Sequence, residues 1–448
     1  LAPLQAQKLA LRAQTVCAPA ASLRQERLTK TRLNSPFGIP PERLGETEIM
    51  NKAEASRQPV TALCGVEGLA HLKTFYEIPG FRIGGTYDLD DPASWESGGR
   101  GGVTLESLGA GPLRAACIAV GTPHRDADGH IDNAILFSPF YSGDAGLMYF
   151  YWHRGQGGND FCGGPAVGPG ELIDTNRYYV VFVDALGLWG ASKPSDGLGL
   201  AFPPYSIFDC VQANYRLLRD HLKVSRIRLA TGASMGAIQS YLWALMHPGC
   251  VEAIMPMGGV TEADASLRWL FRLMSAAIES DPSWRATSGR YYHLPKEQHP
   301  YRGVMFGWSI LFHSAMSFDH RIEAGWEAVQ KEAFAWEMHG KEGAILVPYG
   351  RNYDAIDLLY RNRAGEAFDV TGRLDRIRAR TLILHVANDH WVRLCMARRA
   401  HERIPGSRLC SFEHPLGHYA LFQAPNVFRD TIRAFLEGAP TSPSGERI

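Results

Sequence analysis

The stretch "LATGASMGAIQSYLWALMHPG", residues 229–249, decides the fold of this chain. It begins in a short apolar run, turns sharply at Gly-Ala-Ser-Met-Gly and continues with the spacing of an amphipathic helix. The glycines flanking Ser234 let a strand and a helix approach closely, and the turn holds the serine at the amino end of the helix. Backbone amides and the helix dipole favour negative charge there. We therefore interpret Ser234 as a nucleophile; the alternative is a tight turn with an idle serine.

Short, nearly continuous apolar runs recur on both sides of that stretch. They are residues 133–139, 178–184, 226–232, 252–258 and 381–387. Such runs are typical of strands buried on both faces, so they predict a mostly parallel sheet covered by helices. Amphipathic segments at 206–223 and 235–247 predict crossover helices, and strands that alternate with helices indicate an α/β fold.

The chain is expected to form one large α/β core with an insertion. Residues 76–259 and 376–448 form the core. The aromatic-rich stretch 260–375 is too long for a single crossover, so it predicts a mostly helical cap over the carboxyl edge of the sheet. Residues 1–75 are expected to be an N-terminal arm or extension, because prolines follow its basic start without a sustained period.

The composition argues against several classes of partner. Lys and Arg total 46, as do Asp and Glu, so we expect no nucleic acid and no anionic membrane surface. No apolar run approaches the ~20 residues that cross a bilayer. We expect a cytoplasmic protein, with a leader remnant as the alternative interpretation of residues 1–34. The eight cysteines lack zinc spacing and are expected to be buried thiols, with an oxidised pair as the alternative.

A serine of ordinary acidity needs a general base, and the base needs an orienting carboxylate. On a sheet of this kind both follow the nucleophile in the chain, each in a loop after a strand. The run 381–387 leads into Asp389, the predicted acid, and the apolar segment 408–414 leads into His418, the predicted base. His414 is the rival base, but packing or capping is more typical at a strand end.

An oxyanion hole needs two hydrogen-bond donors near the nucleophile. We predict the backbone N–H groups of Met235, directly after the serine, and of Tyr141, after the strand at 133–139. The glycine-rich segment 154–170 lacks the Gly-Lys-Ser/Thr ending of a phosphate loop and is predicted to be a loop at the active-site mouth.

A metal site is the competing interpretation of the late histidines. Its ligands would be His385, His390, His414 and His418 with Asp389. Pro415 and Gly417 interrupt the helix that would place the last two histidines on one face, and no pair has a recognised ligand spacing. We therefore expect no metal.

The chain resembles the homoserine O-acetyltransferase group of the α/β-hydrolase superfamily, from about residue 103 to 437. The likeness lies in residues 168–187, in Gly-x-Ser-Met-Gly followed by Gln239, and in residues 277–284, 353–370 and 417–422. The resemblance implies the α/β-hydrolase fold and a helical cap. It also implies the triad Ser234, Asp389 and His418, which agrees with the choice made from the residues, and often a homodimer.

The departures from that family concern the substrate. Homoserine-binding members place an Asp directly after the catalytic His, and an Arg and a Tyr seven residues apart in a cap helix. The corresponding positions here are Tyr419, Trp308 and Ala315, and no Arg occurs in residues 303–316. A buried homoserine carboxylate or ammonium without a charged partner would cost several kcal/mol. The three residues therefore predict an apolar substrate pocket.

Three functions follow from these patterns. The first is a serine-dependent carboxylic ester hydrolase that acts through an acyl-enzyme on a small or medium, largely uncharged ester, without a cofactor. The alternative is a CoA-dependent O-acyltransferase that uses the same acyl-enzyme and an acceptor other than homoserine. The third, a non-catalytic binding protein, is disfavoured because nucleophile, acid and base are all present.

Overall fold

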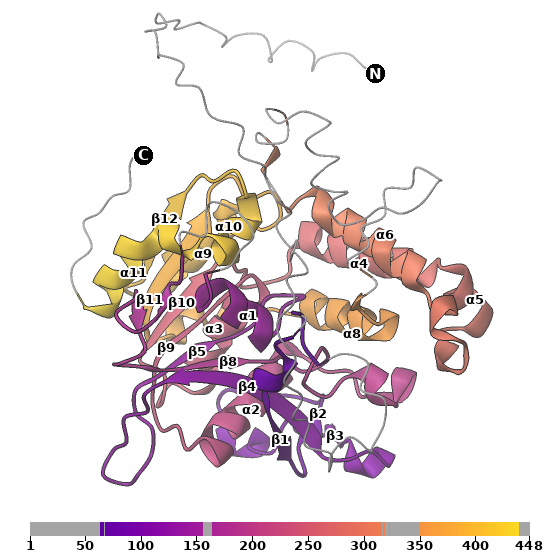
Figure 1. The fold of residues 1–448 in the computed structure, drawn as a ribbon, viewed down its shortest axis with the longest axis horizontal. Coiled ribbons are helices and arrows are strands. Elements are labelled where there is room, and N and C mark those ends of the chain that lie inside the picture. The colour runs from indigo at the N-terminus through magenta and orange to yellow at the C-terminus, as the bar shows by residue number, and fades with distance from the viewer. Residues whose placement is uncertain are drawn as a thin grey trace, which may run out of the picture. The chain divides into compact units, whose positions relative to one another are not determined.

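The computed structural model describes residues 63–155, 164–315 and 352–438, except position 67, together with a few single positions between 317 and 350. An eight-stranded sheet in the order β1-β4-β8-β5-β9-β10-β11-β12 forms the centre of these residues (Figure 1). Its strands are β1 (Thr74–Ile78), β4 (Leu113–Gly121), β5 (Ala134–Phe137), β8 (Tyr179–Val183), β9 (Ile227–Ala233), β10 (Ala253–Met257), β11 (Arg380–Val386) and β12 (Arg408–Phe412). Two short pairs lie outside this sheet: β2 (Arg82–Ile83) with β3 (Val103–Thr104), and β6 (Val167–Gly168) with β7 (Ile173–Asp174).

The pairing confirms the predicted, mostly parallel sheet. Every neighbouring pair from β8 to β12 runs parallel, whereas β4 runs antiparallel to both β1 and β8. Each of the five predicted apolar runs overlaps one strand of the sheet, and β9 and β11 each extend one residue beyond the predicted run. β5 and β10 are buried along their whole length, as expected for strands covered on both faces. The antiparallel strands β1 and β4 were not among the predicted runs.

Helices cover the sheet where crossovers were predicted. The core helices are α1 (Ala145–Trp152), α2 (Ile207–Arg216), α3 (Met235–Met246), α9 (Leu394–Arg403), α10 (Ala420–Gln423) and α11 (Arg429–Leu436). α3 is the helix predicted at 235–247. The helix predicted at 206–223 is α2 followed by a π-helical turn, Leu217–His221. α2 packs beside α3, and α1 packs beside α10.

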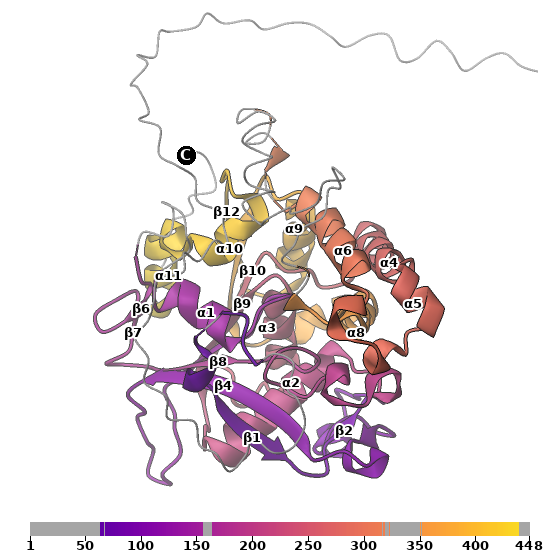
Figure 2. The same cartoon turned by 45° about the vertical axis from the view of Figure 1, so that its right-hand side comes forward.

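The described elements between β10 and β11 are all helical. They are α4 (Ala265–Glu279), α5 (Pro282–Thr287), α6 (Tyr301–His313), α8 (Ala355–Glu366) and the short 3-10 segments Tyr291–His293, Lys296–Gln298 and Thr371–Arg376. The four α-helices gather on one side of the sheet in both views (Figures 1 and 2). α4 buries Leu267, Phe271, Met274 and Ile278, a spacing of three or four residues that forms one apolar face. α4 packs against α6 and α8.

Gly65 and Lys73 contact the core, although the sequence places them in an extension that ends at residue 75. The N–H of Gly65 donates to Asp144 Oδ2 (2.9 Å) at the start of α1. The Lys73 side chain is buried, and its Nζ bonds carboxylates of the core. The packed unit therefore begins before β1.

The structure also bears on the expectations about membrane-spanning segments, the cysteines and the glycine-rich loop. No helix in the described ranges is both long enough and apolar enough to cross a membrane. The six cysteines in those ranges are unpaired; Cys117 and Cys210 are buried, whereas Cys395 is exposed. Residues 156–163, the middle of the predicted glycine-rich loop, lie outside the described residues.

Candidate active site

Ser234 is the single residue that connects β9 to α3. β9 ends at Ala233, and α3 begins at Met235. The backbone angles of Ser234, φ 55° and ψ −117°, lie outside the regions that L-residues favour, a strain that costs about 1–3 kcal/mol. Its N–H donates to the carbonyl of Met257 at the end of β10 (2.8 Å). The turn therefore fixes the serine at the carboxyl edge of the sheet, at the amino end of a helix.

The two glycines of the turn are required by the strand beside it. A Cβ atom added to Gly232 or Gly236 would overlap the carbonyl oxygen of Ser138, which directly follows β5. The N–H of Ser138 donates to the carbonyl of Thr231 (2.8 Å), so this backbone segment cannot withdraw without breaking the sheet. The two glycines therefore allow the turn around Ser234 to approach the backbone that follows β5, and the sequence predicts such a close approach.

We expect Gly236→Ala to destabilise the protein by about 1–3 kcal/mol, because the new methyl group overpacks a rigid backbone contact. Urea unfolding of the variant measures the change. Gly249→Ala is the matched control, since nothing lies within 4 Å of the Cβ that it would add. Equal unfolding midpoints for the two variants would contradict the contact that we describe.

Asp389 and His418 form a buried pair. His418 Nδ1 lies 2.6 Å from Asp389 Oδ2, and the exposed fractions of the two side chains are 1% and 0%. The other oxygen, Asp389 Oδ1, accepts from the N–H groups of Trp391 (2.8 Å) and Val392 (2.9 Å). These two bonds fix the carboxylate, so only one oxygen is left to orient the imidazole.

The free end of the imidazole is His418 Nε2. This nitrogen is buried and has no hydrogen-bond partner among the described residues. The backbone of His418 is held from the cap, because its N–H donates to the carbonyl of Ala315 just after α6 (2.9 Å). A histidine that gives Nδ1–H to a carboxylate presents Nε2 as a base.

The sheet brings the serine and this pair to one edge. The strand register aligns Ala233 with Met257, and Met257 with Leu384, across β9, β10 and β11. Ser234 comes directly after β9, and Asp389 follows β11 after a short turn. Parallel strands end at the same edge of a sheet, so the loops that carry these residues lie on the same side.

The two residues predicted to supply oxyanion donors also lie at this edge. Tyr141 follows β5, which pairs directly with β9. Its side chain is buried, and its hydroxyl donates to Asn362 Oδ1 on α8 (2.6 Å). Met235 is the first residue of α3, so its N–H has no carbonyl partner within the helix.

A buried ion cluster supports the loop that carries Tyr141. Lys73 Nζ lies 2.6 Å from Asp144 Oδ2 and 2.7 Å from Asp184 Oδ2. Asp144 also caps α1, where its Oδ1 accepts from the N–H of Leu147 (2.7 Å). Burial alone would lower the pKa of Lys73, but the two carboxylates raise it above its ordinary value. Burial raises the pKa of Asp184, and Lys73 opposes that shift. No local sequence pattern predicts this cluster, because Lys73 is 71 and 111 residues from its two partners.

The three residues predicted to line a substrate pocket lie in the cap and beside the base. Trp308 is a buried residue of α6, with its ring centroid 6.3 Å from that of Tyr141. Ala315 is fully buried just after the same helix. Tyr419 directly follows the histidine of the pair, and its ring centroid lies 5.5 Å from that of Phe422. Aromatic rings thus accompany two of the three positions.

Two of the other late histidines, His414 and His385, make local backbone hydrogen bonds. His414 Nδ1 accepts from the N–H of Leu416 (3.2 Å), which is a capping role at the end of β12. His385 Nδ1 donates to the carbonyl of Val386 (2.8 Å), and burial lowers the pKa of this histidine. Among the described residues, three ligand-type side chains converge only at Asp126, Asp128 and His130, in a separate loop.

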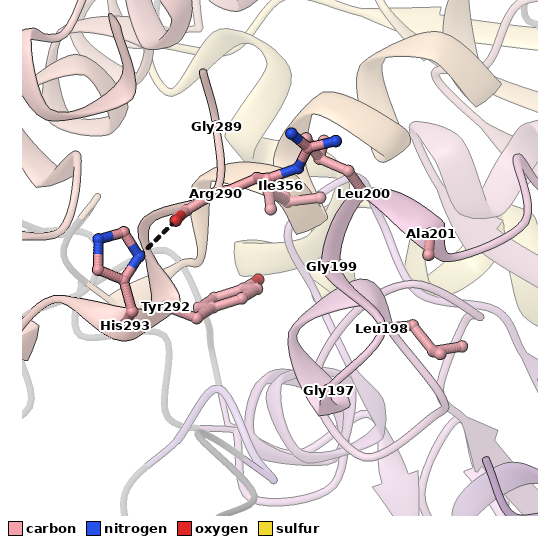
Figure 3. Close-up of a pocket in the computed structure, with 10 residues that line it drawn as sticks. All are labelled: Gly197, Leu198, Gly199, Leu200, Ala201, Gly289, Arg290, Tyr292, His293 and Ile356. Carbon is pink, nitrogen blue, oxygen red and sulfur yellow. Dashed lines mark hydrogen bonds between the residues drawn. The ribbon is translucent and has the colours of Figure 1, made fainter. Parts of the chain in front are cut away.

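A cavity of about 460 Å³ lies between the core and the cap, away from the predicted triad residues. One wall is residues 197–201, which follow β8, and the opposite wall is formed by the cap residues Gly289, Arg290, Tyr292 and His293. Figure 3 shows Arg290 and Tyr292 reaching from the cap wall toward Leu200 and Gly199. Ser234, Asp389 and His418 do not line this cavity, so we assign it no part in the chemistry.

No family model matches the chain, but curated relatives do. A homoserine O-acetyltransferase of Solidesulfovibrio magneticus is 30% identical over 287 residues, which cover 60% of this chain and 69% of the relative. The chain belongs to the homoserine O-acetyltransferase-like family of α/β-hydrolases. Another similar sequence is a probable acyltransferase of Methanothermobacter thermautotrophicus, 27% identical over 324 residues, with 71% of this chain and 89% of the relative covered.

Solved structures of both esterases and transferases share the fold of this family member. An acetylester hydrolase from Corynebacterium glutamicum superposes with a TM-score of 0.63 at 21% identity, over 82% of this chain and 96% of that one. A homoserine O-acetyltransferase from Bacillus anthracis gives a TM-score of 0.60 at 16% identity, over 83% and 98%. These structures show the α/β-hydrolase fold, and together with the family assignment they make the protein an α/β-hydrolase-type enzyme.

Proposed function

We propose that the protein is a serine-dependent carboxylic ester hydrolase that acts through an acyl-enzyme on a small or medium, largely uncharged ester. The observation that supports this most strongly is the buried Asp389–His418 pair, whose Nε2 has no partner in the described part of the chain. It belongs to the same sheet edge as the strained turn at Ser234. A fixed base near a serine hydroxyl makes that neutral group nucleophilic.

In the proposed reaction, Ser234 Oγ attacks the acyl carbon while His418 Nε2 takes its proton. The backbone N–H groups of Tyr141 and Met235 hold the oxyanion of the tetrahedral intermediate. His418 then gives the proton to the leaving alcohol, and the acyl-enzyme remains. A water molecule repeats the sequence with His418 as base, so that ester and water become acid and alcohol. Asp389 stabilises the imidazolium in both halves.

The surroundings of the base support an uncharged substrate. Tyr419, Trp308 and Ala315 are buried and contribute no charge, whereas homoserine-binding relatives carry an Asp and an Arg at the first two of these positions. A charged acceptor would therefore lose its hydration there without gaining a partner. An uncharged ester would bind by apolar burial, at roughly 25 cal/mol per Å².

The test is product analysis by mass spectrometry, with acetyl-CoA plus homoserine beside a plain ester such as p-nitrophenyl acetate. We expect cleavage of the ester and no O-acetylhomoserine. Tyr419→Asp should not create homoserine activity, because the carboxylate would still lack an Arg partner. It should weaken ester binding, and the loss should grow as pH rises through the pKa of the new group, because its ionised form puts charge in an apolar cleft.

Tyr419→Phe is the matched control for that variant, since it keeps the ring and adds no charge. It should bind the ester within a few-fold of the native protein. Efficient formation of O-acetylhomoserine by the native protein would overturn the hydrolase assignment.

A CoA-dependent O-acyltransferase is the second candidate, favoured by the relatives named homoserine O-acetyltransferase and probable acyltransferase. The same serine, base and acid would form the acyl-enzyme, and an alcohol other than homoserine would replace water in the second half. Incubation with acetyl-CoA and a panel of uncharged alcohols separates the two candidates. A new ester product that forms faster than free acetate would favour the transferase.

A further inference from the structure

The cap helix α8 contacts both residues to which we assign oxyanion donors. Asn362 Oδ1 accepts from the hydroxyl of Tyr141 (2.6 Å). The preceding residue, Arg361, places Nη1 3.4 Å from Met235 Sδ. The two contacts come from adjacent residues of α8. They reach two separate places, because Tyr141 follows β5 and Met235 begins α3 after β9.

Asn362 is itself fixed on both sides. It is almost fully buried, and its Nδ2 donates to Ser275 Oγ on α4 (3.0 Å) while its Oδ1 accepts from Tyr141. The amide therefore cannot rotate without losing one bond. It links the Tyr141 side chain, and through it the loop after β5, to the packed pair α4 and α8.

Arg361 is a fully buried cation without a carboxylate partner in the described ranges. Nη2 lies 3.4 Å from the carbonyl of Ala185, the guanidinium lies over the Tyr205 ring at 5.8 Å, and Nε has no partner. All of these neighbours are neutral. Burial of a charge is costly unless an opposite charge compensates it. No described residue supplies that charge, whereas the proposed reaction creates one beside Met235.

We propose that Arg361 and Asn362 are positioning residues for the oxyanion hole. Asn362 holds the loop of Tyr141 in place, and Arg361 sets a fixed positive charge behind Met235. The proposal rests on the proposed function, because it uses the acyl-transfer chemistry of Ser234. A preorganised charge of this kind stabilises the tetrahedral anion more than it stabilises the bound ester, so it acts on kcat more than on KM.

The experiment compares Arg361→Met with Arg361→Lys, which keeps the charge. Arg363→Met is the matched control: Arg363 is on the same helix but exposed, with its guanidinium 5.5 Å from the Tyr360 ring. The readouts are kcat and KM for p-nitrophenyl acetate, the unfolding midpoint, and inhibition by phenylboronic acid. The boron of this inhibitor becomes a tetrahedral anion when a catalytic serine binds it.

We expect Arg361→Met to lower kcat on the order of 10- to 100-fold with KM nearly unchanged. Its affinity for phenylboronic acid should fall by a similar factor. Arg361→Lys should recover most of both losses, and Arg363→Met should behave as the native protein. The inference would be overturned if Arg361→Met were less stable but kept its kcat. It would also be overturned if KM rose while phenylboronic acid still bound normally.

The Tyr141–Asn362 bond provides a test that does not depend on the folding of an Arg361 variant. Tyr141→Phe removes one buried hydroxyl and keeps the ring. We expect a lower kcat at constant KM in Tyr141→Phe and Asn362→Ala, with no further loss when they are combined. Fully additive losses would contradict a shared role. Absence of Ser234-dependent turnover in the native protein would overturn the proposed function itself, whereas native turnover with unaffected variants would overturn only this inference.

Discussion

Ser234→Ala is expected to lower turnover on the order of a million-fold and to abolish labelling by a fluorophosphonate. The hydroxyl is the only group of the side chain that can form the acyl-enzyme, and no other serine shares its place in the turn between β9 and α3. The residual rate would come from substrate binding and the oxyanion hole alone. The fold should survive, because alanine at this position removes a single oxygen atom.

Ester hydrolysis and mass spectrometry of the labelled peptide measure the two effects. Ser240→Ala is the matched control: Ser240 lies on the same helix, and its hydroxyl only donates to the carbonyl of Gly236 (3.0 Å). This control should keep both labelling and turnover. Retained turnover in a pure Ser234→Ala preparation would contradict the acyl-enzyme mechanism of both the proposed hydrolase and the proposed transferase.

The second large effect is expected from His418→Ala, with a loss comparable to that of the serine variant, on the order of a million-fold. In the proposed mechanism its imidazole is the base, and Asp389 acts only through it. His414→Ala should leave turnover within about tenfold, because His414 caps the loop and acts only by small shifts of geometry.

Both histidine variants should be tested for folding by circular dichroism before their kinetics are compared. His418 is buried in the short 3-10 segment Gly417–Tyr419 after β12 and belongs to no strand of the sheet, so we expect similar spectra. A folded His414→Ala protein without activity, together with an active His418→Ala protein, would show that we have assigned the base to the wrong end of the loop.

Local patterns in the sequence determined the sheet and the order of the site residues. Five apolar runs indicated five strands, because a strand buried on both faces must be apolar along its length. Glycines around Ser234 indicated a close approach of backbones, which the Ser138 carbonyl now explains. Asp389 was chosen because it follows a strand, and the structure places it against His418.

Only the tertiary structure decided which distant residues pack around the predicted site residues. The Tyr141–Asn362 bond joins positions 221 residues apart, and the Lys73–Asp184 pair joins positions 111 apart. Periodicity and turn chemistry describe neighbours in the chain, so they carry no information about such pairs. Arg361 illustrates the difference: a charged residue in a helical pattern suggests an exposed face, yet packing of α8 on the core buries it completely behind Met235. The sequence by itself predicted a nucleophile, an acid and a base, whereas only the folded chain shows which residues pack around them, because those contacts join positions far apart in the sequence.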